Sequence, residues 1–287
     1  MPNSKIIRTA PETQEEKDWI PPSGTLGRLV AAANARTAGL NPSRDADAIR
    51  NARSGLRPLS AALDGENVAI IAEIKRSSPS KGSINPAIKS GEQAELYQSG
   101  GASAISVLTE PEKFGGSDDD IALVKATSPL PVLKKDFHVT ELQIVHAASL
   151  NVAAALVIVR AVSPGQLEML ARTARELSLE LVFEVRDEDE LRQALDLDAR
   201  VIGVNNRNLE TLEVDPTTVE RIVPLIPRDR FAIAESGYSS AESIAAAAAA
   251  GADAVLIGSH VSASTDPAGA IRRIASIPKS RGRRSGR

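Results

Sequence analysis

Residues 68–82 read VAIIAEIKRSSPSKG, and this stretch separates the two fold classes that suit the chain. Its aliphatic first half predicts a strand that is buried on both faces, as in a parallel sheet covered by helices. The turn that follows, KRSSPSKG (75–82), has one glycine, at its end. A doubly wound dinucleotide-binding sheet usually carries a G-x-G-x-x-G turn at this place. We therefore keep the doubly wound sheet only as the alternative to a barrel.

Seven further aliphatic runs follow the first, at 104–109, 130–136, 153–159, 179–185, 200–206, 230–236 and 253–259. Helical patterns lie between most of them, such as SPGQLEMLARTARELS (163–178) and EDELRQALD (188–196). Strands that alternate with helices indicate parallel βαβ units. Eight such units are the number in a (β/α)8 barrel. The sequence thus predicts an α/β protein with a single (β/α)8 TIM barrel and an N-terminal helical extension.

The predicted barrel and its flanking segments divide the chain into four parts. Residues 1–23 are polar and contain prolines, so we expect a flexible extension. Residues 24–66 read as one or two amphipathic helices that cap the barrel, and 67–277 form the catalytic barrel. Residues 278–287 end in a basic run, KSRGRRSGR, and are expected to be a flexible, solvated tail.

Composition excludes several classes of function. The net charge of −3 gives no general attraction to nucleic acid or to an anionic membrane. The chain has no cysteine, and its three histidines do not form a close pair, so we expect no metal site. Neither a signal peptide nor a membrane-spanning run is apparent. We expect a cytoplasmic monomer or weak homo-oligomer that acts on a small molecule and binds neither nucleic acid nor membrane.

Polar side chains gather at the ends of the predicted strands, where barrel enzymes place their active sites. Glu73 and Lys75 share one face of the first strand, because strand side chains alternate with a period of two. Six of the eight runs end in ionisable, amide or small polar residues: Glu73, Lys75, Lys134, Lys135, Asp136, Glu184, Asn205, Asn206, Arg207, Glu235, Ser236, Gly237, Gly258 and Ser259. Their convergence on one barrel mouth predicts an active site.

A purely structural interpretation remains open for most of these residues. Lys134 and Lys135 could form a solvated strand end, and Glu184 could pair with Arg186. The pair Asn205–Asn206 could form a turn, because asparagine tolerates left-handed backbone. The glycines at 237 and 258 could cap helices. With a helix N-terminus, however, glycine N–H groups also form the usual phosphate site of a barrel, which is the interpretation we favour.

The ionisable groups of this mouth suit acid–base chemistry. Lys75 and Lys135 beside Glu73, Glu184 and Glu235 offer acids and bases without a metal or a histidine. Such a site could transfer protons to a carbonyl or hydroxyl group of a phosphorylated sugar. A lysine that forms a Schiff base is an alternative on the same residues.

Long motifs of the chain resemble the indole-3-glycerol phosphate synthase family. They are IAEIKRSSPSKG, ISVLTEPEKFGGS, PVLKKDF, VFEVRDEDEL, IGVNNRNLETLEVD, AESGY and GADAVLIGS, in the family's order over roughly 68–275. The resemblance implies a cofactor-free and metal-free reaction on 1-(2-carboxyphenylamino)-1-deoxyribulose 5-phosphate. Ring closure and loss of carbon dioxide and water give indole-3-glycerol phosphate in tryptophan biosynthesis.

The resemblance also implies roles for individual residues. Lys135 matches the general acid of ring closure, Glu184 its acid–base partner, Lys75 the second essential lysine, and Glu73 the residue that holds Lys75. Asn205 matches a residue that hydrogen-bonds the reacting hydroxyl. The positions that match substrate-binding residues are Ser78, Phe114, Phe137, Arg207, Leu209, Glu235 and Ser236. Those that match phosphate ligands are Ser80, Lys81, Gly237, Gly258 and Ser259.

Two aromatic residues support this assignment independently. Phe114 and Phe137 follow the second and third strands and suit a wall for a flat anthranilate ring, although ordinary hydrophobic packing is the alternative.

Three segments depart from the family pattern. HVSAS (260–264) replaces the usual GESLM-like continuation, Asn151 stands where glycine is frequent, and GTLGRLVAAANARTAG (24–39) matches the capping helix weakly. Asparagine can adopt the same left-handed turn as glycine.

Two other functions remain as alternatives at this level. The chain could be another phosphosugar barrel, such as an isomerase or a Schiff-base lyase, which borohydride trapping would reveal. It could also be a catalytically silent paralogue that binds or scaffolds. Retention of Lys75, Lys135, Glu184 and Asn205 together argues against a silent copy.

Overall fold

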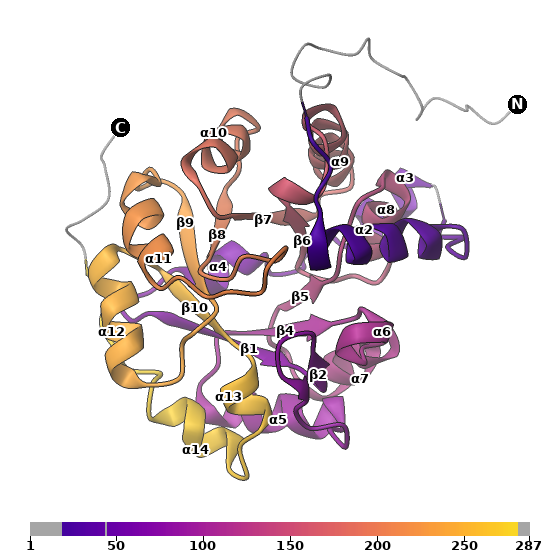
Figure 1. Cartoon of the computed structure of the whole chain (residues 1–287). Helices are drawn as coiled ribbons and strands as arrows, with labels where there is room; N and C mark the ends of the chain where they lie inside the picture. The colour runs from indigo at the N-terminus through magenta and orange to yellow at the C-terminus, as the bar shows by residue number, and fades with distance from the viewer. Residues whose placement is uncertain (1–18, 44, 281–287) are drawn as a thin grey trace, which may run out of the picture.

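A closed barrel of eight parallel strands forms the centre of the molecule, and helices surround it (Figure 1). The computed structural model describes residues 19–43 and 45–280. Most of the expected flexible extension (1–23) and of the basic tail (278–287) therefore lies outside the described residues. The strand order around the barrel is β1-β10-β9-β8-β7-β6-β5-β4. Neighbours along the chain are neighbours in the sheet, as in a TIM barrel, which confirms the predicted fold class.

Every barrel strand lies inside one of the eight aliphatic runs. The strands are β1 (Ala69–Ile74), β4 (Ala104–Leu108), β5 (Val132–Lys135), β6 (Ala154–Ile158), β7 (Glu180–Val185), β8 (Val201–Asn205), β9 (Phe231–Glu235) and β10 (Ala254–Ile257). Two short antiparallel strands, β2 (Ser77–Ser78) and β3 (Gly82–Ser83), form a hairpin directly after β1. This hairpin carries Ser78, Ser80 and Lys81, three of the residues that the resemblance assigns to substrate and phosphate binding.

Helices follow the strands and cover the outside of the barrel. They are α5 (Ser90–Gly100), α6 (Pro111–Phe114), α7 (Asp119–Thr127), α8 (Glu141–Ser149), α9 (Pro164–Glu176), α10 (Glu188–Asp196), α11 (Thr217–Ile222), α12 (Ala241–Ala250), α13 (Ser259–Ser262) and α14 (Pro267–Arg272). Two short 3₁₀ helices, η1 (Val159–Ala161) and η2 (Val223–Leu225), complete the outer layer. Several begin at a side-chain cap; Thr140 and Gln143 form a capping box at α8, for example.

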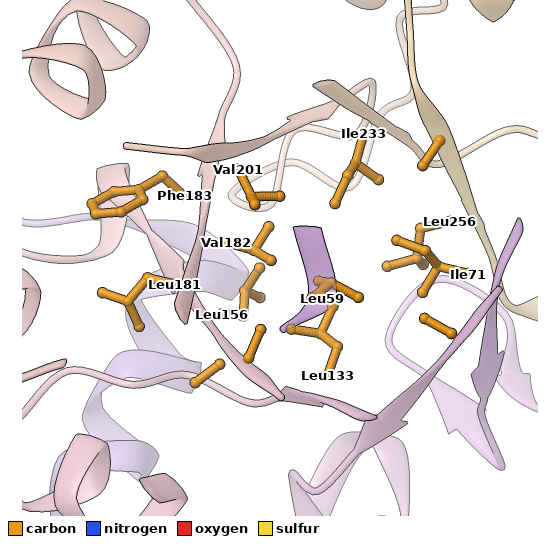
Figure 2. Packing of buried hydrophobic residues seen from close by; sticks show 14 of the residues in the cluster. Leu59, Ile71, Leu133, Leu156, Leu181, Val182, Phe183, Val201, Ile233 and Leu256 are labelled. Atoms are coloured by element: carbon orange, nitrogen blue, oxygen red, sulfur yellow. The ribbon is translucent and has the colours of Figure 1, made fainter. Parts of the chain in front are cut away.

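The barrel interior is filled by aliphatic side chains that lie below the polar mouth. Figure 2 shows Ile71, Leu133, Val182 and Ile233 among the side chains that fill it. Each lies two positions before Glu73, Lys135, Glu184 or Glu235, and two residues along a strand face the same side. The same alternation that fills the barrel therefore turns these four ionisable side chains toward its axis at the C-terminal end.

The N-terminal segment reaches both ends of the barrel. It contains three helices, α2 (Gly24–Thr37), α3 (Ala46–Ala52) and α4 (Leu59–Leu63), so the expected number of one or two was wrong. Helix α2 lies at the mouth, where Arg36 forms an ion pair with Asp136 just after β5. Helix α4 lies at the opposite end, because the N–H of Ser60 donates to Glu180 at the start of β7. Pro58 separates α4 from α3 and starts the extra helix.

Asn151, where family members often carry glycine, adopts the left-handed backbone that we predicted. Its φ angle is 53°, and it lies three residues before Ala154, where β6 begins. Asparagine tolerates this region better than other non-glycine residues because its short polar side chain can bond locally. The substitution leaves the entry to β6 intact.

Candidate active site

One cavity of about 530 Å³ opens at the C-terminal ends of the barrel strands. All of the residues to which the resemblance gives a role, except Glu184, line it: Glu73, Lys75, Ser78, Ser80, Lys81, Phe114, Lys135, Phe137, Asn205, Arg207, Leu209, Glu235, Ser236, Gly237, Gly258 and Ser259. They come from strand ends and loops that are far apart in the sequence. Of the other polar strand ends, Asp136 lines the cavity, whereas Lys134 and Asn206 do not. A volume of this size accommodates a molecule with a phosphate, a pentose chain and one aromatic ring.

At the end of β1, Glu73 and Lys75 form the ion pair expected of a lysine and its holder. The Lys75 Nζ lies 2.7 Å from Glu73 Oε1, and the carboxylate is buried. The ammonium also lies 5.8 Å from the centre of the Phe114 ring, within reach of a cation–π interaction. Lys75 thus faces the cavity from a fixed position.

Lys135 lies among three carboxylates. Its Nζ is 3.4 Å from both Glu184 Oε2 and Glu235 Oε2. Burial alone would lower the pKa of Lys135, but the charges of Glu235, Glu184 and Glu73 together hold it well above its usual value. Lys135 is therefore a cation at any working pH. Glu184 is held on its other side by Asn205, whose Nδ2 donates to Oε1 at 2.8 Å.

Glu235 differs from the neighbouring carboxylates because burial is the largest influence on its pKa. Burial raises the pKa of Glu235 to about 8, against the attraction of Lys135, and Glu184 and Glu73 add repulsion. Its Oε1 is buried and accepts no hydrogen bond from the residues that the structure describes. At neutral pH Glu235 therefore holds a proton for most of the time. The two lysines are then balanced by the carboxylates of Glu73 and Glu184.

Two glycines make space for these carboxylates, Gly203 inside β8 and Gly258 directly after β10. A Cβ on Gly203 would lie 2.3 Å from Glu235 Oε1, and one on Gly258 would lie 2.3 Å from Glu73 Oε1. Any side chain at either position would displace a carboxylate. The role of Gly203 was missed in the sequence, although a glycine inside the aliphatic strand VIGVN is itself a signal of close approach.

The structural interpretations of Lys134 and Glu184 are wrong. Lys134 is not a solvated strand end; it is buried and pairs with Asp118 and, at 3.7 Å, with Asp136. Glu184 pairs with Lys135, not with Arg186. The turn interpretation of Asn205 and Asn206 is confirmed in part: neither residue has a positive φ angle, but Asn205 Oδ1 accepts from the N–H of Arg207, two residues on, at 2.9 Å.

Asn206 instead has a structural role. It donates to Ser236 O and Tyr238 Oη and accepts from the N–H of Val219. The two asparagines therefore differ: Asn205 lines the cavity, whereas Asn206 holds the loop after β9.

The two phenylalanines lie together on one wall of the cavity. The ring centres of Phe114 and Phe137 are 6.3 Å apart and the planes are tilted by 41°. Opposite them, Arg207 contributes a guanidinium that donates to Leu212 O at 2.7 Å. Burial lowers the pKa of Arg207 without removing its charge near neutral pH. The cavity thus combines an aromatic wall with cationic groups.

The predicted phosphate ligands also line the cavity. Ser236 and Gly237 both adopt left-handed backbone, with φ angles of 66° and 93°. Gly258 precedes Ser259, the first residue of α13. The hairpin residues Ser80 and Lys81 line the same cavity. Backbone N–H groups and a lysine side chain are the groups that usually bind a phosphate in a barrel.

Glu184 lies between this cavity and a smaller side pocket of about 130 Å³. It lines only the side pocket, but its ion pair with Lys135 places it at the boundary. Further cavity residues were not predicted as site residues: Leu29, Pro79, Leu108, Leu156, Ile158, Leu212, Tyr238, Ser239, Leu256 and His260. Most are aliphatic or lie in loops, where sequence alone gives no signal that distinguishes a cavity wall from the core.

Two features are absent from the described residues. Within 19–43 and 45–280, no three histidine or acidic side chains come together as a metal site would need. In the same ranges, no helix has the length and apolar character needed to cross a bilayer.

Comparison with known proteins gives one family. Residues 30–274 match the model of the family described as indole-3-glycerol phosphate synthase. Indole-3-glycerol phosphate synthase 1 of Streptomyces coelicolor is 46% identical over 211 residues, which cover 74% of this chain and 78% of that protein. Indole-3-glycerol phosphate synthase 2 of the same organism is 40% identical over 253 residues, covering 87% and 98%. The indole-3-glycerol phosphate synthase of Mycolicibacterium smegmatis is 44% identical over 211 residues, covering 74% and 78%.

Solved structures support the fold. A crystal structure of 3-hexulose-6-phosphate synthase from Salmonella typhimurium superposes with a TM-score of 0.58 at 14% identity, covering 72% of this chain and 97% of that one. A thiamine phosphate pyrophosphorylase from Pyrococcus furiosus gives a TM-score of 0.54 at 13% identity, covering 72% and 93%. At such low identity these likenesses concern the barrel alone.

Proposed function

Because the chain belongs to the indole-3-glycerol phosphate synthase family, we propose that Lys135, Glu184 and Lys75 carry the proton transfers of its reaction. The chain is a carboxy-lyase of tryptophan biosynthesis. Its substrate is 1-(2-carboxyphenylamino)-1-deoxyribulose 5-phosphate. A carbon–carbon bond forms between the aromatic ring and C2 of the ribulose chain, and carbon dioxide and water leave.

Lys135 is the proposed acid of ring closure. As the ring carbon attacks C2, the carbonyl oxygen becomes an alkoxide. An alkoxide is more basic than an amine, so a proton that Lys135 holds tightly still transfers to it. The observation that carries this assignment is the position of Lys135, 3.4 Å from both Glu184 and Glu235 and facing the cavity.

Glu184 is the proposed partner in closure and dehydration. Its carboxylate accepts from Asn205 and Lys135, and this keeps it aligned at the edge of the cavity. Asn205 is positioned to reach a hydroxyl that reacts there. Lys75, held by Glu73, is assigned to the substrate carboxylate or to the departing hydroxyl. When the substrate carboxylate leaves as carbon dioxide, its negative charge disappears from beside the ammonium of Lys75, which Glu73 keeps in place.

The rest of the cavity is assigned to substrate binding. We assign the anthranilate ring to the wall of Phe114 and Phe137, and the phosphate to Gly237, Gly258, Ser259, Ser80 and Lys81. Ser78, Arg207, Leu209, Glu235 and Ser236 border the ribulose chain. No cofactor is required by this scheme.

The Schiff-base alternative is disfavoured by charge. A lysine that attacks a carbonyl must be neutral, whereas the carboxylates of Glu184 and Glu73, joined by Glu235 when it ionises, hold Lys135 in its charged form. We expect sodium borohydride with substrate to leave the protein mass unchanged. A trapped adduct on a lysine would overturn the acid role.

The direct experiment is turnover of the purified protein with the anthranilate–ribulose phosphate, followed by indole fluorescence. We expect Lys135→Ala to lose more than about a thousandfold in kcat, as removal of a general acid usually does, while substrate still binds. Lys113→Ala, an exposed lysine on α6, is the matched control. Retained turnover in Lys135→Ala would exclude the proposed role.

We also propose that the enzyme works in the cytoplasm as a monomer or weak homo-oligomer. The support is chemical: a phosphorylated sugar derivative does not cross membranes freely, so it is made and used in one compartment. Sedimentation of the full chain at several concentrations measures the oligomeric state.

A further inference from the structure

The end of β1 has no strand partner on the side that faces β10. Pairing between these strands stops at Ala72 and Ile257, because the chain turns at Gly258 and enters α13. On the other side, β4 continues to pair as far as Ile74. The backbone of Glu73 and Lys75 therefore loses its β10 ladder where the two side chains enter the cavity.

Ser262 supplies the missing hydrogen bonds. Its hydroxyl donates to the carbonyl of Glu73 at 2.8 Å and accepts from the N–H of Lys75 at 3.2 Å. The hydroxyl of Tyr97 also donates to Glu73 O, at 3.0 Å, and lies 3.2 Å from Ser262 Oγ. Ser262 and Tyr97 are both fully buried. Two hydroxyls thus take the place of a strand edge.

The helix that carries Ser262 also borders the cavity. Gly258 and Ser259, at the start of α13, are among the proposed phosphate ligands. Gly258 is packed so closely that an added Cβ would lie 3.3 Å from Lys75 Nζ. The carbonyl of Ser262 accepts from Asn85 Nδ2 at 3.0 Å, just after the β2–β3 hairpin. One short helix therefore contacts the phosphate end, the hairpin and the strand of Lys75.

We propose that Ser262 is a positioning residue that fixes Lys75 relative to the phosphate end of the cavity. Its hydroxyl replaces the β10 ladder at Glu73 and Lys75, so the ammonium keeps its place when α13 engages the substrate. Ser262 lies within HVSAS, the segment that departs from the family pattern, so the hydroxyl is a feature of this chain's own sequence. This inference rests on the proposed role of Lys75.

The test compares Ser262→Ala with Ser60→Ala. Both serines are fully buried, but Ser60 lies at the opposite end of the barrel and its hydroxyl has no partner among the described residues. Ser262→Ala removes both hydrogen bonds to the backbone that carries Lys75, and we expect it to lower kcat about tenfold, with KM within about threefold. Ser60→Ala keeps wild-type kcat. A Ser262→Ala variant with kcat within twofold of wild type overturns the proposal.

A double-mutant comparison separates positioning of Lys75 from a general structural effect. In a Lys75→Gln background, Ser262→Ala should change the remaining single-turnover rate by less than twofold. An equal loss in both backgrounds shows that Ser262 does not act through Lys75. Full activity of Lys75→Gln itself would instead overturn the proposed function.

Tyr97→Phe provides a second variant if Ser262→Ala folds poorly. It removes the other hydroxyl on Glu73 O and keeps the buried ring. We expect a smaller fall in kcat, about threefold, because Ser262 still holds both backbone groups. Unchanged kcat in Tyr97→Phe, with Ser262→Ala unfolded, counts against the proposal.

Discussion

Gly203 shows how strongly single residues shape this site. It lies in β8, between strands β7 and β9, and its missing side chain is the space that Glu235 Oε1 occupies. The first prediction is that Gly203→Ala displaces Glu235, lowers kcat at least tenfold and destabilises the fold by about 1–3 kcal/mol through overpacking. Steady-state kinetics and urea unfolding measure both effects.

Gly65→Ala is the matched control for that variant. Gly65 has no atom within 4 Å of an added Cβ and is exposed. It should leave kcat unchanged. If Gly203→Ala kept full activity, the close approach between Gly203 and Glu235 would not matter for catalysis.

The second prediction concerns Glu235 and the pH dependence of stability. Unfolded chains ionise a glutamate near 4.5, whereas Glu235 ionises near 8 in the folded protein. Between these values the folded state binds the extra proton, so this group makes the free energy of unfolding fall as pH rises. Glu235→Gln removes that fall and, at pH 8, should be more stable than wild type by on the order of a few kcal/mol.

Urea unfolding at intervals from pH 5 to 8.5 measures this difference. Because glutamine resembles the protonated acid, we expect Glu235→Gln to keep kcat within about tenfold at pH 7. The matched variant Glu184→Gln, which removes the proposed base, should lose about a thousandfold. Parallel stability curves for wild type and Glu235→Gln would contradict the raised pKa.

At the scale of elements, α2 is the segment that joins the N-terminal region to the mouth. Leu29 on α2 lines the cavity, and Arg36 ties the helix to Asp136 at 2.7 Å and to Glu110 at 3.5 Å. At its other end, the N–H of Thr25 donates to Glu210 O. The helix is therefore fastened at both ends across part of the opening.

The third prediction is that Arg36→Met loosens α2 and raises KM about tenfold, with a smaller effect on kcat. The reason is that Arg36 holds a wall of the binding cavity and contacts no proposed acid or base. Arg28→Met, an exposed arginine on the same helix, is the control. A fall in kcat with unchanged KM would show that α2 serves the chemistry and not binding.

Strands were predictable because burial on both faces makes them continuous aliphatic runs. The helices at 24–66 were miscounted because α4 has five residues, LSAAL, too few to show a helical period. The polar strand ends identified most of the cavity. Gly203 and Ser262 could not be identified from the sequence. Gly203 matters because of its contact with Glu235, and Ser262 because of its contact with the backbone of Glu73 and Lys75; both contacts form only in the closed barrel.

At the scale of the whole molecule, a buried network behind β5 controls acid stability. His138 is buried, and its Nδ1 donates to Leu156 O at 2.6 Å. Burial, together with the charge of Lys134, lowers the pKa of His138 to about 4, against the pull of Asp136 and Asp118. The unfolded chain takes up this proton near 6.5. Acidification from 6.5 to 4 therefore favours the unfolded state.

The fourth prediction is that His138→Gln flattens the loss of stability between pH 6.5 and 4. Glutamine can donate to Leu156 O without taking up a proton. Chemical denaturation at several pH values should show a loss smaller than in wild type by on the order of a few kcal/mol. The exposed His260 provides the control, His260→Gln, with the wild-type slope. Equal slopes in His138→Gln and wild type would contradict this account.

Closure of the barrel sets the order in which the working enzyme can arise during synthesis. β1 can pair with β10 only after β10 has been synthesised. Likewise, the N–H of Val68 can donate to the carbonyl of Ile277 only after residue 277 has been added. Glu73, Lys75 and Lys135 leave the ribosome early, whereas the carboxylates and glycines that complete the pocket come from the second half of the chain. We therefore expect no activity from a chain truncated before β10: Lys75 would keep Glu73 and Phe114 but would lose Gly258, Ser259 and Ser262.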